Sequence, residues 1–391
     1  MVEPGFEPVR DAFIANFTEH GDAGAGLCVY HRGHKVVDLV GGWSWQKGGI
    51  PYDDEALQLI FSSTKGATAL CAHLLAERGL LDFDQPVAGY WPEFAAAGKE
   101  EVTVRHLLSH QAGLPTIDNP IKLADVLAWE PVVEALAAQA PFWEPGSAHG
   151  YHALTYGWLV GEVIRRVSGR SIGCFFAEEV AAPLGIDFWI GLPEEQEARV
   201  SRLRIGPLPT LGALRNPKEI DPTIAELAKE IFAPGSLLLR ALTLNGAFGE
   251  FMGGQGPFNN PAVHAAEVPA ANGITNASGL ARMYASMVGE VDGVRLLDKE
   301  SVARATRTES DGKDRVLVTN SRFGLGFMLH AENFSPMLGP ASFGHTGAGG
   351  SVGFADVENQ IGFGYVMNQM RMGLGVDGRP ARLIAALRSC L

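Results

Sequence analysis

A serine and a lysine that stand three residues apart are the side chains of this sequence best suited to covalent chemistry. Ser62 and Lys65 follow the apolar run at residues 57–61, and the stretch at residues 63–80 has the apolar spacing that predicts a helix. Residues three apart share a helix face, so the amine can reach the hydroxyl and activate it as a nucleophile. The free backbone N–H groups at the start of a helix also suit a developing oxyanion.

The same serine–lysine spacing occurs at two other places, so the motif alone is a weak signal. Ser44 and Lys47 lie among glycines that indicate a turn, and Ser310 and Lys313 lie in a polar run that indicates a solvated loop. Only Ser62 has an apolar lead-in and a helix behind it. The alternative, in which Ser62 caps the helix and its lysine lies on the surface, stays open from this segment alone.

A tyrosine is the third group that such chemistry needs. A lysine with its ordinary pKa of about 10.4 is no base near neutral pH, but burial or a nearby positive charge lowers that pKa, and a phenol could then share the proton. Tyr151 is our candidate, because it follows the Pro-Gly turn at residues 145–146 and precedes a helix. The alternative is an ordinary half-buried aromatic residue. Tyr284 competes, but its mid-helix surroundings suit core packing.

A glycine-rich run near the C-terminus reads Gly344-His345-Thr346-Gly347-Ala348-Gly349-Gly350. Such a strand lets a substrate come close and exposes main-chain N–H donors. His345 could donate to a bound carboxylate or carbonyl, or help to set the charge of Lys65 and Tyr151. A strand histidine with ordinary hydrogen-bond partners is the alternative.

Two motifs of other enzyme classes are incomplete here. Residues 349–353 match the G-x-S-x-G elbow, but strand-like residues follow them where the elbow requires a helix, which disfavours Ser351 as the nucleophile. His106 and His110 have the spacing of a zinc-protease helix but lack its glutamate, so packing or capping roles are favoured. We expect neither a metal nor a cofactor.

The composition is that of a globular protein with an acidic surface. The chain has 391 residues, 46% hydrophobic and 19% charged, which suffices for one large domain with insertions or for two lobes. A net charge of -13 argues against nucleic acid or an anionic membrane as a partner. The oligomeric state cannot be inferred from the composition.

The cysteines and the N-terminus bear on the compartment. No two cysteines form a C-x-x-C pair, so neither a zinc site nor a disulfide scaffold is indicated; they are Cys28, Cys71, Cys174 and Cys390. The first residues lack the basic and apolar regions of a signal peptide, and no apolar run is long enough to span a bilayer. We therefore expect a cytoplasmic protein.

Strand patterns stand at both ends of the chain and helical patterns in the middle, which predicts an α+β fold with one sheet built from both ends. The expected strands are residues 25–30, 35–40, 323–330, 341–356 and 360–367. The expected helices, besides 63–80, are residues 6–17, 102–115, 122–140, 158–167, 172–180, 277–289 and 379–390. Residues 200–262, rich in Pro, Gly and Asn, indicate an insertion that forms a pocket wall.

Taken together and in this order, the motifs resemble those of a known family. They are Ser62-x-x-Lys65, the run at residues 107–115, Tyr151, and His345-Thr346-Gly347. They look like the serine β-lactamase superfamily and, more narrowly, its class C-like esterases, the family VIII carboxylesterases. The resemblance implies a β-lactamase/penicillin-binding-protein-like fold, with an antiparallel sheet flanked by helices and a helical lobe beside it.

The resemblance also implies a division of the chain and a role for each site residue. Residues 1–80 and 265–391 would form the α/β lobe, residues 81–200 the helical lobe, and residues 200–262 the pocket wall. Ser62 would be the acylated nucleophile, Lys65 its base, and Tyr151 the proton relay. The backbone N–H groups of Ser62 and Ala348 would form the oxyanion hole, with His345, Thr346 and Gly347 against the substrate.

Two departures from the family pattern favour esters over β-lactams. The β-lactam-hydrolysing members carry Tyr-x-Asn and Lys-Thr-Gly, where this chain has Ala153 as the third residue and His345 as the first. The asparagine amide and the lysine charge hold the amide and the carboxylate of a β-lactam in those members, and this chain lacks both groups. We therefore expect a small-molecule ester substrate. Two alternatives stay open: a β-lactamase, peptidase, amidase or acyltransferase using the same residues, and a non-catalytic binding or scaffold protein on this fold.

Overall fold

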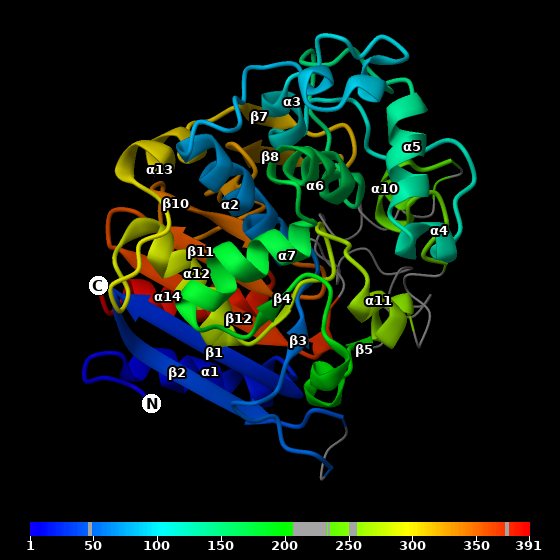
Figure 1. The fold of residues 1–391 in the computed structure, drawn as a ribbon. Helices are drawn as coiled ribbons and strands as arrows, with labels where there is room; N and C mark the ends of the chain where they lie inside the picture. Colours follow the sequence, from blue (N-terminus) through cyan, green and yellow to red (C-terminus); the bar gives the residue numbers. More distant parts are fainter. Residues whose placement is uncertain (46–48, 206–232, 234, 250–255, 372–374) are drawn as a thin grey trace.

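An eight-stranded antiparallel sheet is the largest element of this computed structural model (Figure 1). The structure describes residues 1–391 except 46–48, 206–232, 234, 250–255 and 372–374. The strand order is β2-β1-β12-β11-β10-β9-β8-β7. The strands are β1 (Gly24–His31), β2 (His34–Gly42), β7 (Ser310–Lys313), β8 (Asn320–Phe323), β9 (Met328–Leu329), β10 (Ser342–Thr346), β11 (Val352–Asp356) and β12 (Ile361–Met367). Because β1 pairs with β12, the sheet joins the two ends of the chain, and the predicted α+β fold is confirmed.

The sheet differs from the sequence prediction at three places. Residues 323–330, expected as one strand, hold only the last residue of β8 and the two residues of β9, with no strand at residues 324–327. Residues 310–313, expected as a solvated loop, form the edge strand β7, which pairs with β8. Backbone pairing at a sheet edge defines this strand, so its polar side chains can still face solvent. Residues 341–356, expected as a single strand segment, form β10 and β11 with a tight glycine-rich turn between them.

Helices cover both faces of the sheet. Leu27 and Val29 of β1 point into a core with α1 (Glu7–Glu19) and α14 (Gly378–Arg388), whereas the alternating Cys28 and Tyr30 point into the core on the other face. The other face is covered by α12 (Ala277–Val288) and α2 (Thr64–Glu77) (Figure 1).

Glycines in β12 allow α12 to lie directly on the sheet. A Cβ atom at Gly362 would stand 2.4 Å from the carbonyl oxygen of Ala281, and one at Gly364 would stand 2.5 Å from that of Ala277. The glycines of this strand are therefore required for helix packing.

The middle of the chain is helical, as expected, but the helix bounds differ: the helix expected over residues 102–115 covers only Val104–Leu108, whereas the one expected over residues 158–167 extends over Thr155–Ser168. The helices of this part of the chain are α3 (Val104–Leu108), α4 (Leu123–Leu127), α5 (Glu130–Ala138), α6 (Thr155–Ser168), α7 (Ile172–Phe176), a π-helical turn (Ala177–Ala181) and α8 (Ala182–Leu184). The single helix predicted over residues 122–140 is wrong, because Trp129 between α4 and α5 has a φ of 67°. At this break between the two helices, the Trp129 indole N–H donates to the buried Glu162 of α6 at 3.0 Å.

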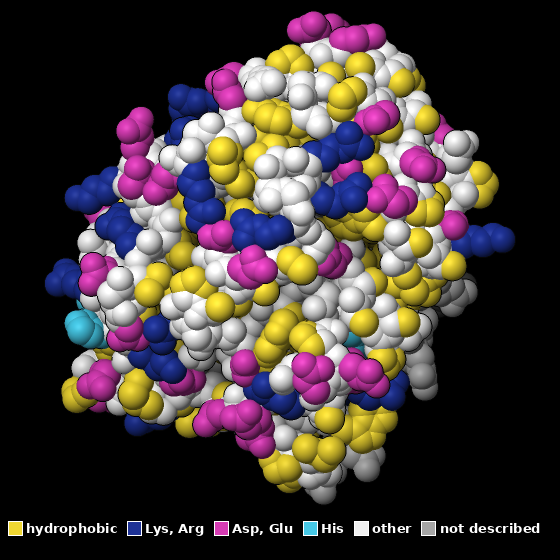
Figure 2. All heavy atoms as spheres, viewed as in Figure 1, with side chains coloured by type: hydrophobic (Ala, Val, Ile, Leu, Met, Phe, Trp, Pro, Cys, Tyr) yellow, Lys and Arg dark blue, Asp and Glu magenta, His cyan; other side chains and the backbone are white. Residues whose placement is uncertain are grey.

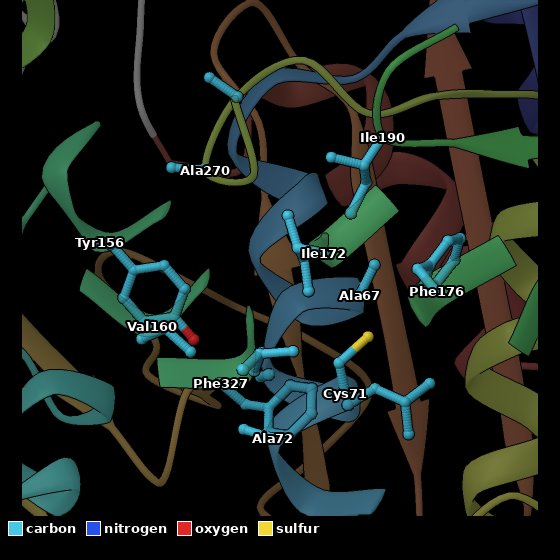
Figure 3. Packing of buried hydrophobic residues seen from close by; sticks show 14 of the residues in the cluster. Ala67, Cys71, Ala72, Tyr156, Val160, Ile172, Phe176, Ile190, Ala270 and Phe327 are labelled. Carbon is cyan, nitrogen blue, oxygen red and sulfur yellow. The ribbon is translucent and has the colours of Figure 1, made fainter. Parts of the chain in front are cut away.

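Helix α2 is the buried centre of the molecule (Figure 3). Its side chains are buried from Thr64 to Leu75. Figure 3 shows Ala67, Cys71 and Ala72 of this helix among larger side chains of α6, α7 and the segment between β8 and β9. Small residues on α2 let these neighbours pack closely, so the first turn of the helix is rigidly supported.

Shorter elements join the sheet to the helical region. Strands β3 (Gln58–Leu59) and β4 (Phe188–Trp189) pair with β6 (Ile274–Thr275), and β13 (Gln369–Met370) pairs in parallel with β5 (Arg204–Ile205). Among the described residues, the remaining α-helices are α10 (Leu237–Thr243), α11 (Pro261–Ala265) and α13 (Lys299–Thr306). Much of the predicted insertion at residues 200–262 lies outside the described residues. Within its described part, Arg240 of α10 binds Asp118 at 2.5 Å.

The surface mixes charges of both signs. On the face shown in Figure 2, Lys and Arg side chains are interspersed with Asp and Glu side chains. Among the described residues, no helix combines the length and the apolar character needed to cross a bilayer.

Candidate active site

Ser62 lies in a strained turn at the entrance of α2. The turn Phe61–Ser63 is a single 3₁₀ turn, and Phe61 has a φ of 46°, which is unusual for an aromatic residue. Thr64 clamps this turn, because its hydroxyl donates to the Phe61 carbonyl at 2.5 Å and accepts from the Gly273 N–H at 2.8 Å. Ser62 is half-buried, whereas Ser63 beside it is fully buried. The turn therefore presents Ser62 as the accessible hydroxyl.

The Lys65 amine is directed at this hydroxyl. Its Nζ lies 3.1 Å from Ser62 Oγ, 2.7 Å from the carbonyl oxygen of Ala153 and 3.0 Å from that of Ala270. A neutral amine has two N–H donors, which the two carbonyls accept, and one lone pair, which is left for the Ser62 hydroxyl. This arrangement suits a base that takes the serine proton.

Burial provides the second requirement for a basic lysine. The Lys65 side chain is fully buried, and this loss of solvation lowers its pKa well below the ordinary value. The amine also lies 4.7 Å from the ring centre of Tyr151. Its surroundings therefore favour the neutral form that can accept a proton.

Tyr151 reaches the same point from a loop that precedes α6. Burial raises the pKa of its phenol, and a hydrogen bond with Ser62 partly opposes that shift. The phenol therefore stays protonated at rest, with its oxygen at the serine. The structure thus brings Ser62, Lys65 and Tyr151, which are distant in sequence, into one site.

The glycine-rich turn after β10 lies against the Ser62 turn. A Cβ atom at Gly347 would stand 2.2 Å from the carbonyl oxygen of Ile60, so only glycine fits there. The Gly347 carbonyl accepts from the Gly350 N–H at 3.1 Å. In a trans peptide the N–H of Ala348 points to the side opposite that carbonyl. The oxyanion-hole role of Ser62 and Ala348 remains a prediction.

His345 is buried and neutral. Its Nδ1 lies 2.7 Å from the Thr346 carbonyl oxygen, which can only accept, so Nδ1 carries the proton and Nε2 is an unprotonated acceptor. Burial lowers the pKa of His345 to about 3, and the nearby Lys65 acts in the same direction. The His345 side chain thus offers an acceptor at Nε2, whereas the sequence analysis expected a donor. Substrate contacts of His345, Thr346 and Gly347 remain predictions.

The competing motifs have structural explanations. Ser351 is fully buried and donates to the Ile60 carbonyl at 2.7 Å, and strand β11 follows it instead of a helix. His106 Nδ1 accepts from the Thr103 N–H at 3.2 Å and caps α3. His110 Nδ1 accepts from the His152 N–H at 3.2 Å. Across the described residues, no group of three or more His, Cys, Asp or Glu side chains could hold a metal ion.

Two buried charged residues near the site were missed by the sequence analysis. Arg379 of α14 donates to the Gly349 carbonyl at 2.5 Å, and Asp314 accepts from the Tyr151 N–H at 3.0 Å. Both belong to polar stretches that resemble surface segments, so no sequence signal marked them as buried. Only the long-range contacts identify them.

Comparison with known proteins identifies the family. The sequence model of the family described as Beta-lactamase matches residues 10–387, and the chain therefore belongs to that family. The resemblance inferred from the motifs is thereby confirmed.

Similar proteins include several that are named as esterases. The chain is 36% identical over 362 residues to the esterase/beta-lactamase LipL of Mycobacterium tuberculosis, covering 91% of this chain and 79% of LipL. It is 38% identical to a crystal structure of a family VIII carboxylesterase, covering 100% and 99% of the two chains with a TM-score of 0.87. It is 34% identical to EstA from Arthrobacter nitroguajacolicus Rue61a, covering 100% and 97% with a TM-score of 0.85.

Proposed function

We propose that this protein is a serine carboxylesterase that cleaves small carboxylic esters through an acyl-enzyme on Ser62. The observation that carries the proposal is the placement of the Lys65 amine, which lies 3.1 Å from Ser62 Oγ while two carbonyls hold its remaining hydrogen-bonding positions. Relatives above 30% identity that are named as esterases support the ester chemistry.

In the acylation step, the neutral Lys65 amine takes the Ser62 proton while Oγ bonds to the ester carbonyl carbon. The carbonyl electron pair moves onto its oxygen, where the N–H groups of Ser62 and Ala348 stabilise the negative charge. Collapse of this intermediate breaks the bond to the alcohol oxygen. Tyr151 gives its phenolic proton to that oxygen and receives the proton held by Lys65, so the free alcohol leaves and the acyl-enzyme remains.

Deacylation repeats these steps with water in place of serine. Water attacks the acyl carbonyl carbon while its proton passes through Tyr151 to the neutral Lys65 amine. The intermediate then expels Ser62 Oγ, which recovers the proton, and the carboxylic acid leaves. The raised pKa of the Tyr151 phenol fits this cycle, since the relay starts and ends with the phenol protonated.

The site is better suited to esters than to β-lactams. Ala153, at the position of the family's asparagine, has no amide side chain, and its carbonyl is bound to Lys65 at 2.7 Å. His345, at the position of the family's lysine, has a pKa of about 3 and therefore carries no charge at neutral pH. An ester needs only one polarised carbonyl, whereas a β-lactam substrate also presents an amide and a carboxylate.

Turnover of short p-nitrophenyl esters, with a chromogenic cephalosporin in parallel, tests the proposal. We expect ester hydrolysis by the wild type, a loss of at least about 10³-fold in Ser62→Ala, and little cephalosporin turnover. Mass spectrometry after fluorophosphonate labelling should place the adduct on Ser62. Wild-type protein without ester turnover, or an unchanged rate in Ser62→Ala, would contradict the proposal, and an adduct on Ser351 would favour the elbow motif.

We also propose the lobe arrangement predicted from the sequence, with residues 1–80 and 265–391 in one lobe, residues 81–200 in a helical lobe, and residues 200–262 lining the substrate pocket. This division is supported by the positions of the elements in the chain, because the strands of the large sheet lie within residues 24–42 and 310–367 and helices α3 to α7 lie within residues 104–176. A cytoplasmic location is proposed as well, and the four free cysteines fit a reducing compartment.

A further inference from the structure

A buried carboxylate lies behind the proposed proton relay. Asp314 follows the edge strand β7, and its side chain is fully buried. A buried carboxylate requires compensating hydrogen bonds. The groups that donate to Asp314 therefore show which parts of the backbone it fixes.

Four hydrogen-bond donors surround this carboxylate. Oδ1 accepts from the backbone N–H groups of Tyr151 at 3.0 Å, Val316 at 2.8 Å and Leu317 at 2.8 Å. Oδ2 accepts from the Ser321 hydroxyl at 2.8 Å. All four partners donate, which matches an ionised carboxylate that can only accept.

The hydrogen bond to Tyr151 acts on a segment that has no regular secondary structure. Residues 139–152 lie outside any helix or strand, so contacts from other elements must fix their backbone. The Asp314 turn supplies two of them, because the Arg315 N–H also donates to the His149 carbonyl at 3.1 Å. The His149 ring in turn lies 3.0 Å from Ser321, which closes the network.

We propose that Asp314 is a positioning residue that holds the Tyr151 backbone and, through it, the phenol at Ser62. The inference rests on the proposed esterase function, since it concerns the same proton relay. Asp314 does not contact the reacting atoms. It acts through Tyr151, and a shift of about 1 Å in such a group lowers the rate about 100-fold.

The negative charge of Asp314 has a second effect on the relay. Burial is the main cause of the raised pKa of the Tyr151 phenol, and the Asp314 charge adds to it. The other titratable groups near the Tyr151 side chain are Lys65, His110, His345 and Tyr156. Burial lowers the pKa values of the first three and raises that of Tyr156, so all four tend to be neutral. Removing the Asp314 charge should therefore lower the pKa of the phenol.

The test compares Asp314→Asn and Asp314→Ala with the matched control Asp311→Asn, an exposed carboxylate three residues earlier on β7. Asparagine keeps an oxygen for the three N–H donors but loses the charge, whereas alanine loses both. With p-nitrophenyl butyrate, we expect kcat to fall about tenfold in the asparagine variant and about 100-fold in the alanine variant, with KM within twofold. The alkaline limb of kcat should move to lower pH in Asp314→Asn.

Hydrogen exchange measured by mass spectrometry on the peptide containing Tyr151 gives a readout that needs no turnover. We expect faster exchange in both Asp314 variants and unchanged exchange in Asp311→Asn. If the alanine variant does not fold, the asparagine variant and Ser321→Ala, which removes only the donor to Oδ2, carry the test, with a smaller kcat loss expected in Ser321→Ala.

The outcomes separate the two proposals. If the wild-type protein shows no ester turnover, the esterase function is contradicted. Hydrogen exchange at Tyr151 then still tests whether Asp314 holds the Tyr151 backbone. If Asp314→Asn folds with kcat within twofold of wild type, an unmoved alkaline limb and unchanged exchange at Tyr151, the positioning role is overturned. Equal losses in Asp311→Asn and Asp314→Asn would overturn it as well.

Discussion

Arg379 Nη2 donates a 2.5 Å hydrogen bond to the main-chain oxygen of Gly349, in the turn that follows β10. The guanidinium is fully buried and also donates to the Gln369 carbonyl at 2.7 Å and to Asp22 at 2.9 Å. The C-terminal helix therefore supports the turn that carries the Ala348 N–H. A planar group with several fixed donors suits this task, because it satisfies carbonyls and a carboxylate together.

The first prediction concerns this support. Arg379→Lys keeps the charge but cannot reach all of these acceptors, so buried groups lose partners and the free energy of unfolding should fall by about 1–3 kcal/mol. The loosened turn should also lower kcat for esters about tenfold through weaker oxyanion stabilisation. Urea unfolding and ester kinetics measure the two effects.

Arg382→Lys is the matched control, because Arg382 lies one turn further along α14 and pairs with Glu19 at the surface. We expect neither effect in this variant. Equal behaviour of the two variants would show that Arg379 has no special link to the glycine-rich turn.

The second prediction is a pH dependence set by Lys65. Burial lowers the pKa of its amine well below the ordinary value, and only the neutral amine can take the Ser62 proton. The acylation rate should therefore rise with pH and reach its plateau well below the ordinary lysine pKa of about 10.4. Lys65→Arg, which stays charged at every such pH, should lose about 10²–10⁴-fold in kcat/KM.

Lys99→Arg is the matched control for Lys65→Arg, because Lys99 is also a buried lysine but does not contact Ser62. Its Nζ donates to three carbonyls, of Ala96, Ala137 and Gln139, and burial lowers its pKa to about 8. This variant should keep the pH profile of ester hydrolysis.

Stability offers a further check on Lys65. Because the pKa of Lys65 is depressed in the folded state, the unfolded chain binds more protons than the folded chain at any pH between that pKa and about 10.4. The free energy of unfolding should therefore rise with pH up to about 10.4. Lys65→Met should lose the part of that rise that comes from Lys65, while Lys99, whose pKa is lowered to about 8, keeps its own contribution.

Local sequence rules were sufficient to predict three side chains that the structure brings together, Ser62, Lys65 and Tyr151. Ser62 and Lys65 are linked by helix spacing, and the position of Tyr151 between a Pro-Gly turn and a helix marked it as a residue that could project into a cleft. The shared sheet was predictable as well, because the alternation of apolar and polar residues that marks the strands at both ends of the chain is a local property of the sequence.

The supporting residues could not be found in this way. Asp314 lies in a polar run that predicts a solvated loop, yet tertiary contacts bury it beneath the Tyr151 segment. The break at Trp129 likewise depends on the distant Glu162, while the helical pattern continues through it. Long-range hydrogen bonds override local preference at these positions, and a single sequence carries no signal for such pairs.

A third prediction concerns the close approach at Gly347. A Cβ atom there would lie 2.1 Å from Ser351 Oγ and 2.2 Å from the Ile60 carbonyl oxygen, so Gly347→Ala must push the turn away from Ser62. We expect kcat to fall about 100-fold, because Ala348, the proposed oxyanion donor in this turn, moves away from Ser62. Gly339→Ala, where the added Cβ has no neighbour within 4 Å, should behave as wild type. Steady-state kinetics on both variants decide the matter, and comparable rates in the two would refute the packing argument.

The last prediction concerns the clamp on the strained serine turn. The Thr64 hydroxyl donates to the Phe61 carbonyl at 2.5 Å and accepts from the Gly273 N–H at 2.8 Å. Thr64→Val keeps the shape of the side chain but leaves both buried groups without this partner, so the free energy of unfolding should fall by about 1–3 kcal/mol. With Phe61 free to relax from its positive φ, Ser62 should also turn away from Lys65, and the rate of fluorophosphonate labelling should drop.

Thr275→Val provides the comparison for this clamp. Thr275 is also buried, and its hydroxyl donates at 2.7 Å to the carbonyl of Asp187, which is not part of the serine turn. This variant should lose stability to a similar extent while Ser62 keeps its wild-type labelling rate. A drop in labelling that follows stability equally in both variants would mean that Thr64 acts on the fold alone. A drop confined to Thr64→Val would mean that the clamp maintains the strained geometry that presents the nucleophile.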